Sequence, residues 1–204
     1  MICPRFHEKT SKERKEQLYC YPAGLDISPS KKVIVEIGPG RGDFLWHLSK
    51  SNPDAIVVAV EIKGKRSANL ITRSQQRKLD NIVIVQGNAK QALPAFFPLE
   101  SISELHVNFP DPWPKTKHRS NRLLQRDFLL SCIERLKKEG EFFFATDYED
   151  YAKSVAKLVS TLPAFKTYYE ERIVQEAEHA FPTFFFEKWK QMGRSFYYQR
   201  YRKV

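Results

Sequence analysis

The sequence predicts an α/β fold in which helices cover both faces of a doubly wound, mostly parallel β-sheet. Short apolar runs rich in Val, Ile and Phe alternate with longer segments that have helical spacing, as in repeated βαβ units. The runs are nearly continuous in apolar residues, which is typical of parallel strands buried on both faces. A cluster of glycines follows the first run, where sheets of this kind bind ligands beyond the carboxyl ends of the strands.

The elements follow in a regular order from residue 33 to residue 161. The expected strands are Val33–Gly38, Ala55–Ile62, Asn81–Gly87, Ile102–Phe109 and Glu141–Thr146. The expected helices are Asp43–Ser51, Lys65–Lys78, Gln91–Phe97, Arg122–Lys138 and Tyr148–Thr161. The tail differs, because Phe165–Ile173 and Ser195–Arg202 read as strands on either side of Val174–Gly193. A closing antiparallel hairpin is therefore expected there.

Length and composition indicate one globular domain. The chain has 204 residues, of which 42% are apolar, and 34 Lys and Arg against 24 Asp and Glu give a net charge of +10. No apolar run approaches the roughly 20 residues of a membrane span, and the first seventeen residues lack a secretory apolar segment. We expect a cytoplasmic protein with no membrane partner, composed of a charged, partly flexible lead-in over 1–30 and one domain over 31–204.

Cysteine and histidine spacing gives no support for a metal site or a disulfide framework. The three cysteines are widely separated and form no CxxC pair, and the five histidines show no HExxH spacing. They are Cys3, Cys20, Cys132, His7, His47, His106, His118 and His179. We therefore predict reduced thiols and no metal.

The loop after the first strand has the sequence Gly38-Pro-Gly-Arg-Gly-Asp43. A dinucleotide fingerprint would need glycine where Asp43 stands, and Pro39 removes a backbone donor, so a nicotinamide oxidoreductase is disfavoured. No Gly-Lys-Ser/Thr follows, which excludes a Walker phosphate loop. A tight turn with no ligand remains the alternative for a glycine cluster alone.

Two carboxylates flank this loop. Glu36 lies in the first strand, where an acid suits a cationic ligand such as a sulfonium or ammonium group, and Glu61 ends the second strand, where an acid can bind ribose hydroxyls. Asn88 and Ala89 follow the third strand, where an amide can meet an adenine edge. The combination favours S-adenosylmethionine as the cofactor.

Three prolines brace the segment after the fourth strand. Pro110, Pro112 and Pro114 fix their own φ, and each restricts the preceding residue to extended conformations. Asp111 and Trp113 should therefore stand on a stiff arch at the ligand-binding edge, with Trp113 as a candidate for base stacking. A purely stabilising apolar arch is the alternative.

Residues 33–200 resemble the bacterial tRNA (guanine-N7-)-methyltransferase family. The resemblance rests on EIGPGRG, on the second-strand VEI, on NFPDPWPK with His118 and Arg122-Leu, on FFFATD, and on a late Pro-Thr followed by Glu. It implies a Rossmann-like class I methyltransferase fold with a seven-stranded sheet whose C-terminal strand is antiparallel. It also implies transfer of a methyl group from S-adenosylmethionine to N7 of the variable-loop guanine of tRNA.

The motifs assign roles to individual positions. Cofactor contacts fall on Glu36, Gly38, Gly40, Glu61, Asn88, Ala89 and Asp111; substrate contacts fall on Lys115, Asp147, Thr183 and Glu187. The family often has Asp where this chain has Asn88, and its Thr and Glu are three residues apart, whereas Thr183 and Glu187 are four apart. Guanine N7 carries an exposed lone pair, so the reaction needs alignment more than a base. Asp111 is the expected catalytic residue, holding guanine donors together with Asp147.

Two clusters of basic residues favour tRNA as the partner. One covers 115–126 with no acid, and the other covers 188–203, with Glu187 as its one neighbouring acid. Solvated surface is the alternative for each cluster, and core packing is the expected role of most tail aromatics. The protein is expected to be a monomer or a homodimer.

Two other functions stay open at this point. One is a methyltransferase that acts on another RNA or a small molecule, and the other is a catalytically silent RNA-binding module. The presence of Glu36, Glu61 and Asp111 argues against the silent module.

Overall fold

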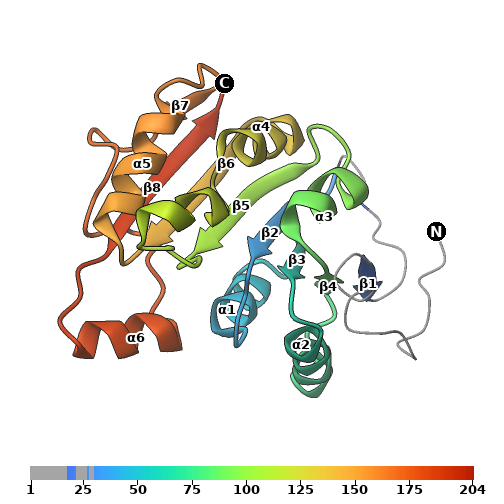
Figure 1. The fold of residues 1–204 in the computed structure, drawn as a ribbon. Helices are drawn as coiled ribbons and strands as arrows, with labels where there is room; N and C mark the ends of the chain where they lie inside the picture. The colour runs from blue at the N-terminus through green and yellow to red at the C-terminus, as the bar shows by residue number, and fades with distance from the viewer. Residues whose placement is uncertain (1–17, 22–26, 28–29) are drawn as a thin grey trace.

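The computed structural model describes residues 18–21, 27 and 30–204 (Figure 1). Most of the predicted lead-in lies outside these residues, so its flexibility and its boundary at residue 30 stay predictions. Cys3 and His7 also lie outside the described residues. Among the described residues, no helix is long and apolar enough to cross a membrane.

Eight strands form one mixed sheet in the described part of the chain. The strands are β1 (Tyr19–Tyr21), β2 (Val33–Ile37), β3 (Ile56–Glu61), β4 (Ile82–Gln86), β5 (Ile102–Asn108), β6 (Leu136–Thr146), β7 (Phe165–Thr167) and β8 (Tyr197–Lys203). Their spatial order is β1-β4-β3-β2-β5-β6-β8-β7. The five central strands are parallel, so they all end at the same edge of the sheet. This edge is the expected place for a ligand.

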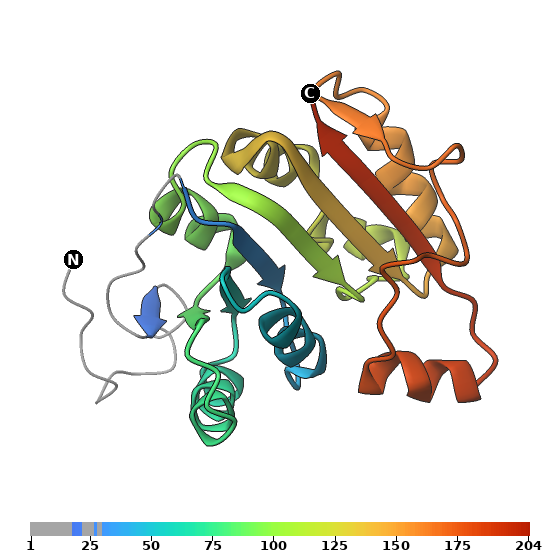
Figure 2. The same ribbon diagram turned by 180° about the vertical axis from the view of Figure 1, so that it is seen from behind.

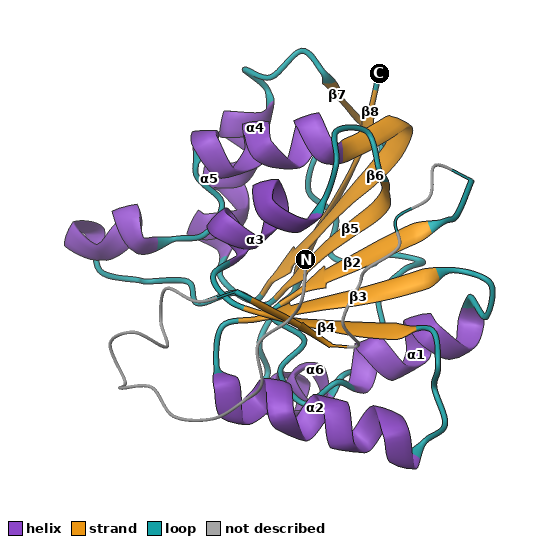
Figure 3. Cartoon of the chain, turned by 90° about the vertical axis from the view of Figure 1, so that its right-hand side faces the viewer, coloured by secondary structure: helices purple, strands orange, loops and turns teal. Residues whose placement is uncertain are grey.

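Helices cover both faces of the sheet, with α3, α4 and α5 on one face and α1 and α2 on the other (Figure 3). The helices are α1 (Asp43–Ser51), α2 (Gly64–Gln76), α3 (Ala89–Phe96), α4 (Arg126–Arg135), α5 (Glu149–Val159) and α6 (Phe184–Gln191), with the 3-10 helix η2 (Thr116–Asn121). Neighbouring strand residues point to opposite faces. Val33 and Val35 accordingly join the core under α3, α4 and α5, whereas Ile34 joins the core under α1 and α2.

The predicted doubly wound fold is confirmed, with one strand more than the seven expected. The additional strand is β1, which pairs antiparallel with β4 through Cys20 and Val85. Cys20 is buried at this edge. The run Tyr-Cys-Tyr is too short to carry a periodic signal. Its pairing partner also lies more than sixty residues further along the chain, outside any local window of sequence.

The helix expected over Arg122–Lys138 is shorter than predicted at both ends. The helix α4 ends at Arg135, and β6 begins directly at Leu136, which is buried and pairs with Ile102. The residues after Leu136 have helical propensity, but pairing with β5 overrides this weak local preference. A Cβ at Gly140 would lie 2.8 Å from the carbonyl oxygen of Lys137, so the close backbone packing of this segment requires glycine.

The antiparallel C-terminal strand is confirmed, because β8 pairs with both β6 and β7. The strand expected over Phe165–Ile173 is wrong beyond Thr167, where the chain leaves the sheet. The helix α6 lies in the connection between β7 and β8, beyond the ends of β5 and β6 (Figure 2). This position puts the tail helix at the same edge as the glycine loop.

Candidate functional site

A cavity of about 360 Å³ opens at the carboxyl ends of β2, β3, β4 and β5. This volume is within the usual range of small-molecule sites. Eight of the eleven cofactor and substrate positions predicted from the sequence line it: Glu36, Gly38, Gly40, Glu61, Asn88, Ala89, Asp111 and Thr183. The structure therefore brings together all of the predicted cofactor positions.

The glycine loop forms one wall of the cavity. The backbone N–H of Gly38 donates to the carbonyl of Val60 at 2.9 Å, which fixes the start of the loop to β3. Gly42 has φ +90°, and a Cβ there would lie 2.4 Å from the Trp46 ring. A glycine is therefore required at position 42 both by the backbone conformation and by the packing of the first turn of α1.

Glu36 and Glu61 are both buried at the floor of the cavity, at 3% and 2% exposure. Burial, with the nearby Asp43 and Glu61 carboxylates, raises the pKa of Glu36 to about 8. One oxygen of Glu61 accepts a hydrogen bond from the backbone N–H of Lys63 at 2.8 Å. The Oε2 atoms of Glu36 and Glu61 have no hydrogen-bond partner among the described residues. Buried carboxylate oxygens require partners, so the site needs a ligand with donors or positive charge.

This cluster of acids is not arranged for a metal ion. Among the described residues, no group of three or more His, Cys, Asp or Glu side chains has a geometry that could hold one. A larger organic cation with hydroxyl donors is the better match to two separate carboxylates.

Asn88 closes another wall by capping α3. Its side-chain oxygen accepts from the backbone N–H of Lys90 at 3.0 Å, as an N-cap residue does. Ala89 follows, buried in the first turn of the helix. An Asp at position 88 could form the same cap, so the neutral Asn preserves the local structure.

The arch between β5 and η2 carries Asp111 and Trp113 on the cavity wall. The expectation that residues before proline are extended is wrong at two positions, because φ is +49° at Phe109 and +42° at Trp113. Bulky residues adopt such values only when their surroundings enforce them, at a cost of about 1–3 kcal/mol each. The N–H of Phe109 donates to Ala145 at 2.8 Å, and Arg122 Nε donates to the carbonyl of Pro112 at 2.9 Å. These contacts maintain the strained arch.

Arg122 is the buried anchor of the arch, with 3% of the residue exposed. Besides Pro112, its guanidinium donates to Asp150 at 2.7 Å and to Ser154 at 3.2 Å. It also lies 4.7 Å from the centroid of the Tyr151 ring. The arch is thus fastened to α5 through one side chain with a fixed fork of donors.

The N-terminus of α6 closes the cavity from the side of the tail. Thr183 caps this helix by accepting from the N–H of Phe186 at 3.1 Å. Asp43 Oδ2 accepts from the N–H of Phe184 at 3.2 Å, and the Arg41 guanidinium lies 4.1 Å from the centre of the Phe184 ring. The tail helix is therefore tied to the glycine loop and to the first turn of α1.

These tail contacts were not predicted, although one sequence signal was available. Thr directly before a run of helix-compatible residues is an N-cap signature, which identifies Thr183 as a helix start. Nothing local in the sequence pairs Asp43 with Phe184, because 141 residues separate them. Phe184 and Phe185 line the cavity, and each remains about half exposed.

Three predicted substrate residues lie outside the cavity lining. Lys115 and Glu187 are exposed, and Asp147 forms an ion pair with Arg194. The Arg194 guanidinium in turn lies 3.7 Å from the Trp189 ring of α6. The substrate roles of these three residues stay predictions.

Much of the charge in the two predicted basic clusters is paired with acids. Arg119 and Arg122 both pair with Asp150. In the tail, Arg200, Arg202 and Lys203 pair with acids on β6 or in the loop before β5. These side chains hold the sheet and its connections together, so they are weaker candidates for phosphate contact than the sequence indicates.

Comparison with known proteins gives a consistent family. Residues 30–199 match the model of a family described as "Putative methyltransferase". The chain is 31% identical to a tRNA (guanine-N(7)-)-methyltransferase of Geobacter metallireducens over 173 residues, covering 84% of this chain and 82% of the relative. It is 38% identical to a protein of the same name from Arthrobacter sp., over 70% of this chain and 44% of the relative. The chain thus spans about half the length of several relatives that it matches.

A solved structure shows the same fold. A SAM-dependent methyltransferase from Aquifex aeolicus superposes with a TM-score of 0.61 over 87% of this chain and 86% of that chain, at 11% identity. The expected Rossmann-like fold is confirmed by this similarity.

Proposed function

Since the chain belongs to the tRNA (guanine-N7-)-methyltransferase family, we propose that it transfers a methyl group from S-adenosylmethionine to N7 of the variable-loop guanine of tRNA. A cytoplasmic location is part of this proposal, because the substrate is tRNA. The observation that carries the proposal is the pair of buried carboxylate oxygens that have no hydrogen-bond partner in the described part of the chain, beside a strained arch at one cavity.

The residues present fit S-adenosylmethionine. Glu36 is protonated near neutral pH in the ligand-free protein, and a bound ammonium or sulfonium group beside Asp43 would favour its ionised form. Glu61 is the last residue of β3, and its Oε2 can accept hydrogen bonds from ribose hydroxyls. Asn88 and Ala89 lie where they can contact the adenine ring. The bound cofactor supplies an activated methyl group on sulfur.

The protein's task is then to hold guanine N7 in line with that methyl group. N7 has an exposed lone pair, so positioning supplies most of the rate advantage and no strong base is required. Asp111 lines the cavity and can accept from the N1–H and amino groups of guanine. This contact also stabilises the cationic methylated base. Asp147 can join it only by exchanging its present partner Arg194.

Labelled methyl transfer to unmodified tRNA, followed by nucleoside digestion, tests the proposal. We expect N7-methylguanosine as the product, and we expect Asp111→Asn to reduce kcat by about 10²-fold, the scale of one lost transition-state contact. A different methylated nucleoside would retain the cofactor and reject the substrate. Absence of both transfer and cofactor binding would favour a silent RNA-binding module.

A further inference from the structure

The segment 62–79 carries a net positive charge. It contains Lys63, Lys65, Arg66, Arg73, Arg77 and Lys78, and no Asp or Glu. This segment covers α2 and the residues on either side of it. Neither of the two basic clusters noted in the sequence includes it.

These positive charges are not neutralised within the described part of the chain. None of the six side chains forms an ion pair there, in contrast to Arg119, Arg122, Arg200 and Arg202. Arg73 donates to the carbonyl of Arg41 at 3.0 Å, and Arg77 donates to the carbonyl of Arg73 at 3.2 Å. Carbonyl partners orient these guanidinium groups without cancelling their charge, so the potential at this surface is positive.

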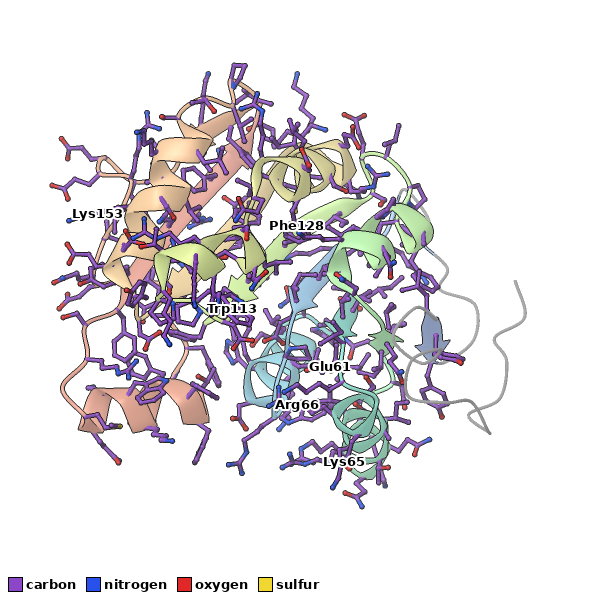
Figure 4. All side chains as sticks on the ribbon, viewed as in Figure 1. Glu61, Lys65, Arg66, Trp113, Phe128 and Lys153 are labelled. Carbon is purple, nitrogen blue, oxygen red and sulfur yellow. The ribbon has the colours of Figure 1, made fainter. Side chains whose placement is uncertain are left out.

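The cationic segment begins at the cavity. Lys63 and Arg66 line the cavity, next to the buried Glu61. In Figure 4, Trp113 lies on the arch side, and Arg66 and then Lys65 follow beyond Glu61 on α2. A nucleic acid strand that leaves the cavity on this side would therefore place its first phosphate near Lys63 and Arg66.

The remaining exposed side chains of α2 are small or polar. They are Ala68, Asn69, Thr72, Gln75 and Gln76. Arg66, Asn69 and Arg73 recur at helical spacing and so share one stripe along the helix. The helix has 13 residues and is roughly 20 Å long, which is enough for several consecutive phosphates of a nucleic acid strand.

We propose that Lys63, Lys65, Arg66, Arg73 and Arg77 form an RNA phosphate-binding surface, the α2 cationic surface, which holds the strand next to the target base. This inference rests on the proposed function. RNA is favoured over an anionic lipid surface, because the exposed side chains of α2 are small, polar or charged, and Ile62, the exposed large apolar residue of the segment, lines the cavity.

The test compares two double variants for binding of unmodified tRNA without cofactor, by fluorescence anisotropy over a series of salt concentrations. One variant is Lys65→Glu with Arg66→Glu. The matched control is Lys138→Glu with Lys166→Glu, two exposed lysines on β6 and β7, which lie on the other side of β5 from the strands that contact α2. Lys65→Glu alone is a third variant, because Lys65 does not line the cavity.

We expect the α2 double variant to bind tRNA about tenfold more weakly near physiological salt, with a slope of log K against log salt smaller by about 1.4–1.8 for two lost phosphate contacts. The single variant should show a smaller loss, and the control should match the wild type. An equal loss in the control, or no loss in the α2 variants, would reject the inference. So would wild-type binding to phosphatidylserine vesicles without binding to tRNA.

This binding test and the labelled methyl-transfer assay together separate the two proposals. A wild-type protein that binds tRNA through α2 but forms no N7-methylguanosine would refute the proposed reaction and leave the binding surface established.

Discussion

Glu36 holds a carboxyl group where its surroundings oppose ionisation. It is buried, it faces Asp43 and Glu61, and its pKa is raised to about 8. Such a group destabilises the ligand-free fold in its ionised form and gains a partner when a cationic ligand binds. Shifted carboxyl groups of this kind are typical of binding and catalytic sites.

The first prediction concerns pH and stability. Between pH 4.5 and 8 the folded protein keeps a proton on Glu36 that the unfolded chain has released, so the free energy of unfolding falls as pH rises through this window. Glu36→Gln should remove this contribution and make the ligand-free protein more stable than the wild type at pH 8. Urea unfolding of both proteins at several pH values measures the difference.

A constant difference between wild type and Glu36→Gln across that pH range would contradict the prediction. The same variant should bind S-adenosylmethionine more weakly, because the negative partner of the cation is lost. Calorimetric titration with the cofactor provides this second measurement.

The second prediction separates the charge of Arg122 from its geometry. Arg122→Lys retains attraction to Asp150 but cannot also donate to Pro112 and Ser154, whereas Arg122→Gln loses the charge. We expect Arg122→Gln to lower the free energy of unfolding by about 2–4 kcal/mol and Arg122→Lys to lower it less. Both variants should have a low kcat/KM, because neither retains the guanidinium geometry. Full recovery of activity in the Lys variant would show that the guanidinium hydrogen bonds of Arg122 do not position the arch.

At the scale of elements, the site is assembled from two segments that converge on the glycine loop. The arch arrives from β5, and α6 arrives from the β7–β8 connection. Aromatic residues of α6 pack against a separate small core. In this core the ring centroids of Phe186 and Phe196 lie 4.5 Å apart. The helix is therefore supported at its middle by packing and at its N-terminus by Asp43.

The third prediction tests that N-terminal tether. Asp43→Ala removes the acceptor of the Phe184 N–H, whereas Asp43→Asn retains an acceptor and removes only the charge. We expect amide hydrogens of α6 to exchange about fivefold faster in the Ala variant, corresponding to about 1 kcal/mol for one hydrogen bond. The Asn variant should exchange at nearly the wild-type rate; equal acceleration in both would assign the effect to charge.

Elements with a strong local signal were predictable, and those fixed by distant partners were not. The run Val33–Ile37 is apolar except for Glu36, as expected of a strand buried on both faces, so its pattern alone identifies a strand. The α4–β6 junction and β1 depend on pairing with β5 and β4, which no short window of sequence contains. The positive φ of Trp113 likewise depends on Arg122, which overrides the preference before proline.

The candidate site divides in the same way. Glu36, Glu61 and Asn88 were predictable because the carboxyl ends of parallel strands share one edge. The tether between Asp43 and Phe184 was not predictable, because it joins the start of the domain to its end. Asp147 was recognised from its motif, but its pairing with Arg194 is visible only in the folded chain.

For the whole molecule, the net charge of +10 supports attraction of a polyanion. The fourth prediction is that tRNA binding by the wild type weakens steeply with salt, by about 0.7–0.9 log units in K per log unit of salt for each phosphate contact. Cofactor binding should depend much less on salt, because its contacts are short and buried. Parallel titrations over one salt series compare the two, and a flat profile for tRNA would refute the electrostatic account.

The connection that carries α6 begins and ends at one point of the sheet. Val174 and Tyr198 exchange two backbone hydrogen bonds, at 3.0 and 2.8 Å, so residues 175–196 leave the sheet and return to it side by side. A segment with adjoining ends can be exchanged without rethreading the chain. Grafting another segment between residues 174 and 198 should therefore replace the cavity wall formed by Thr183, Phe184 and Phe185, while the sheet that carries Glu36 and Glu61 stays in place.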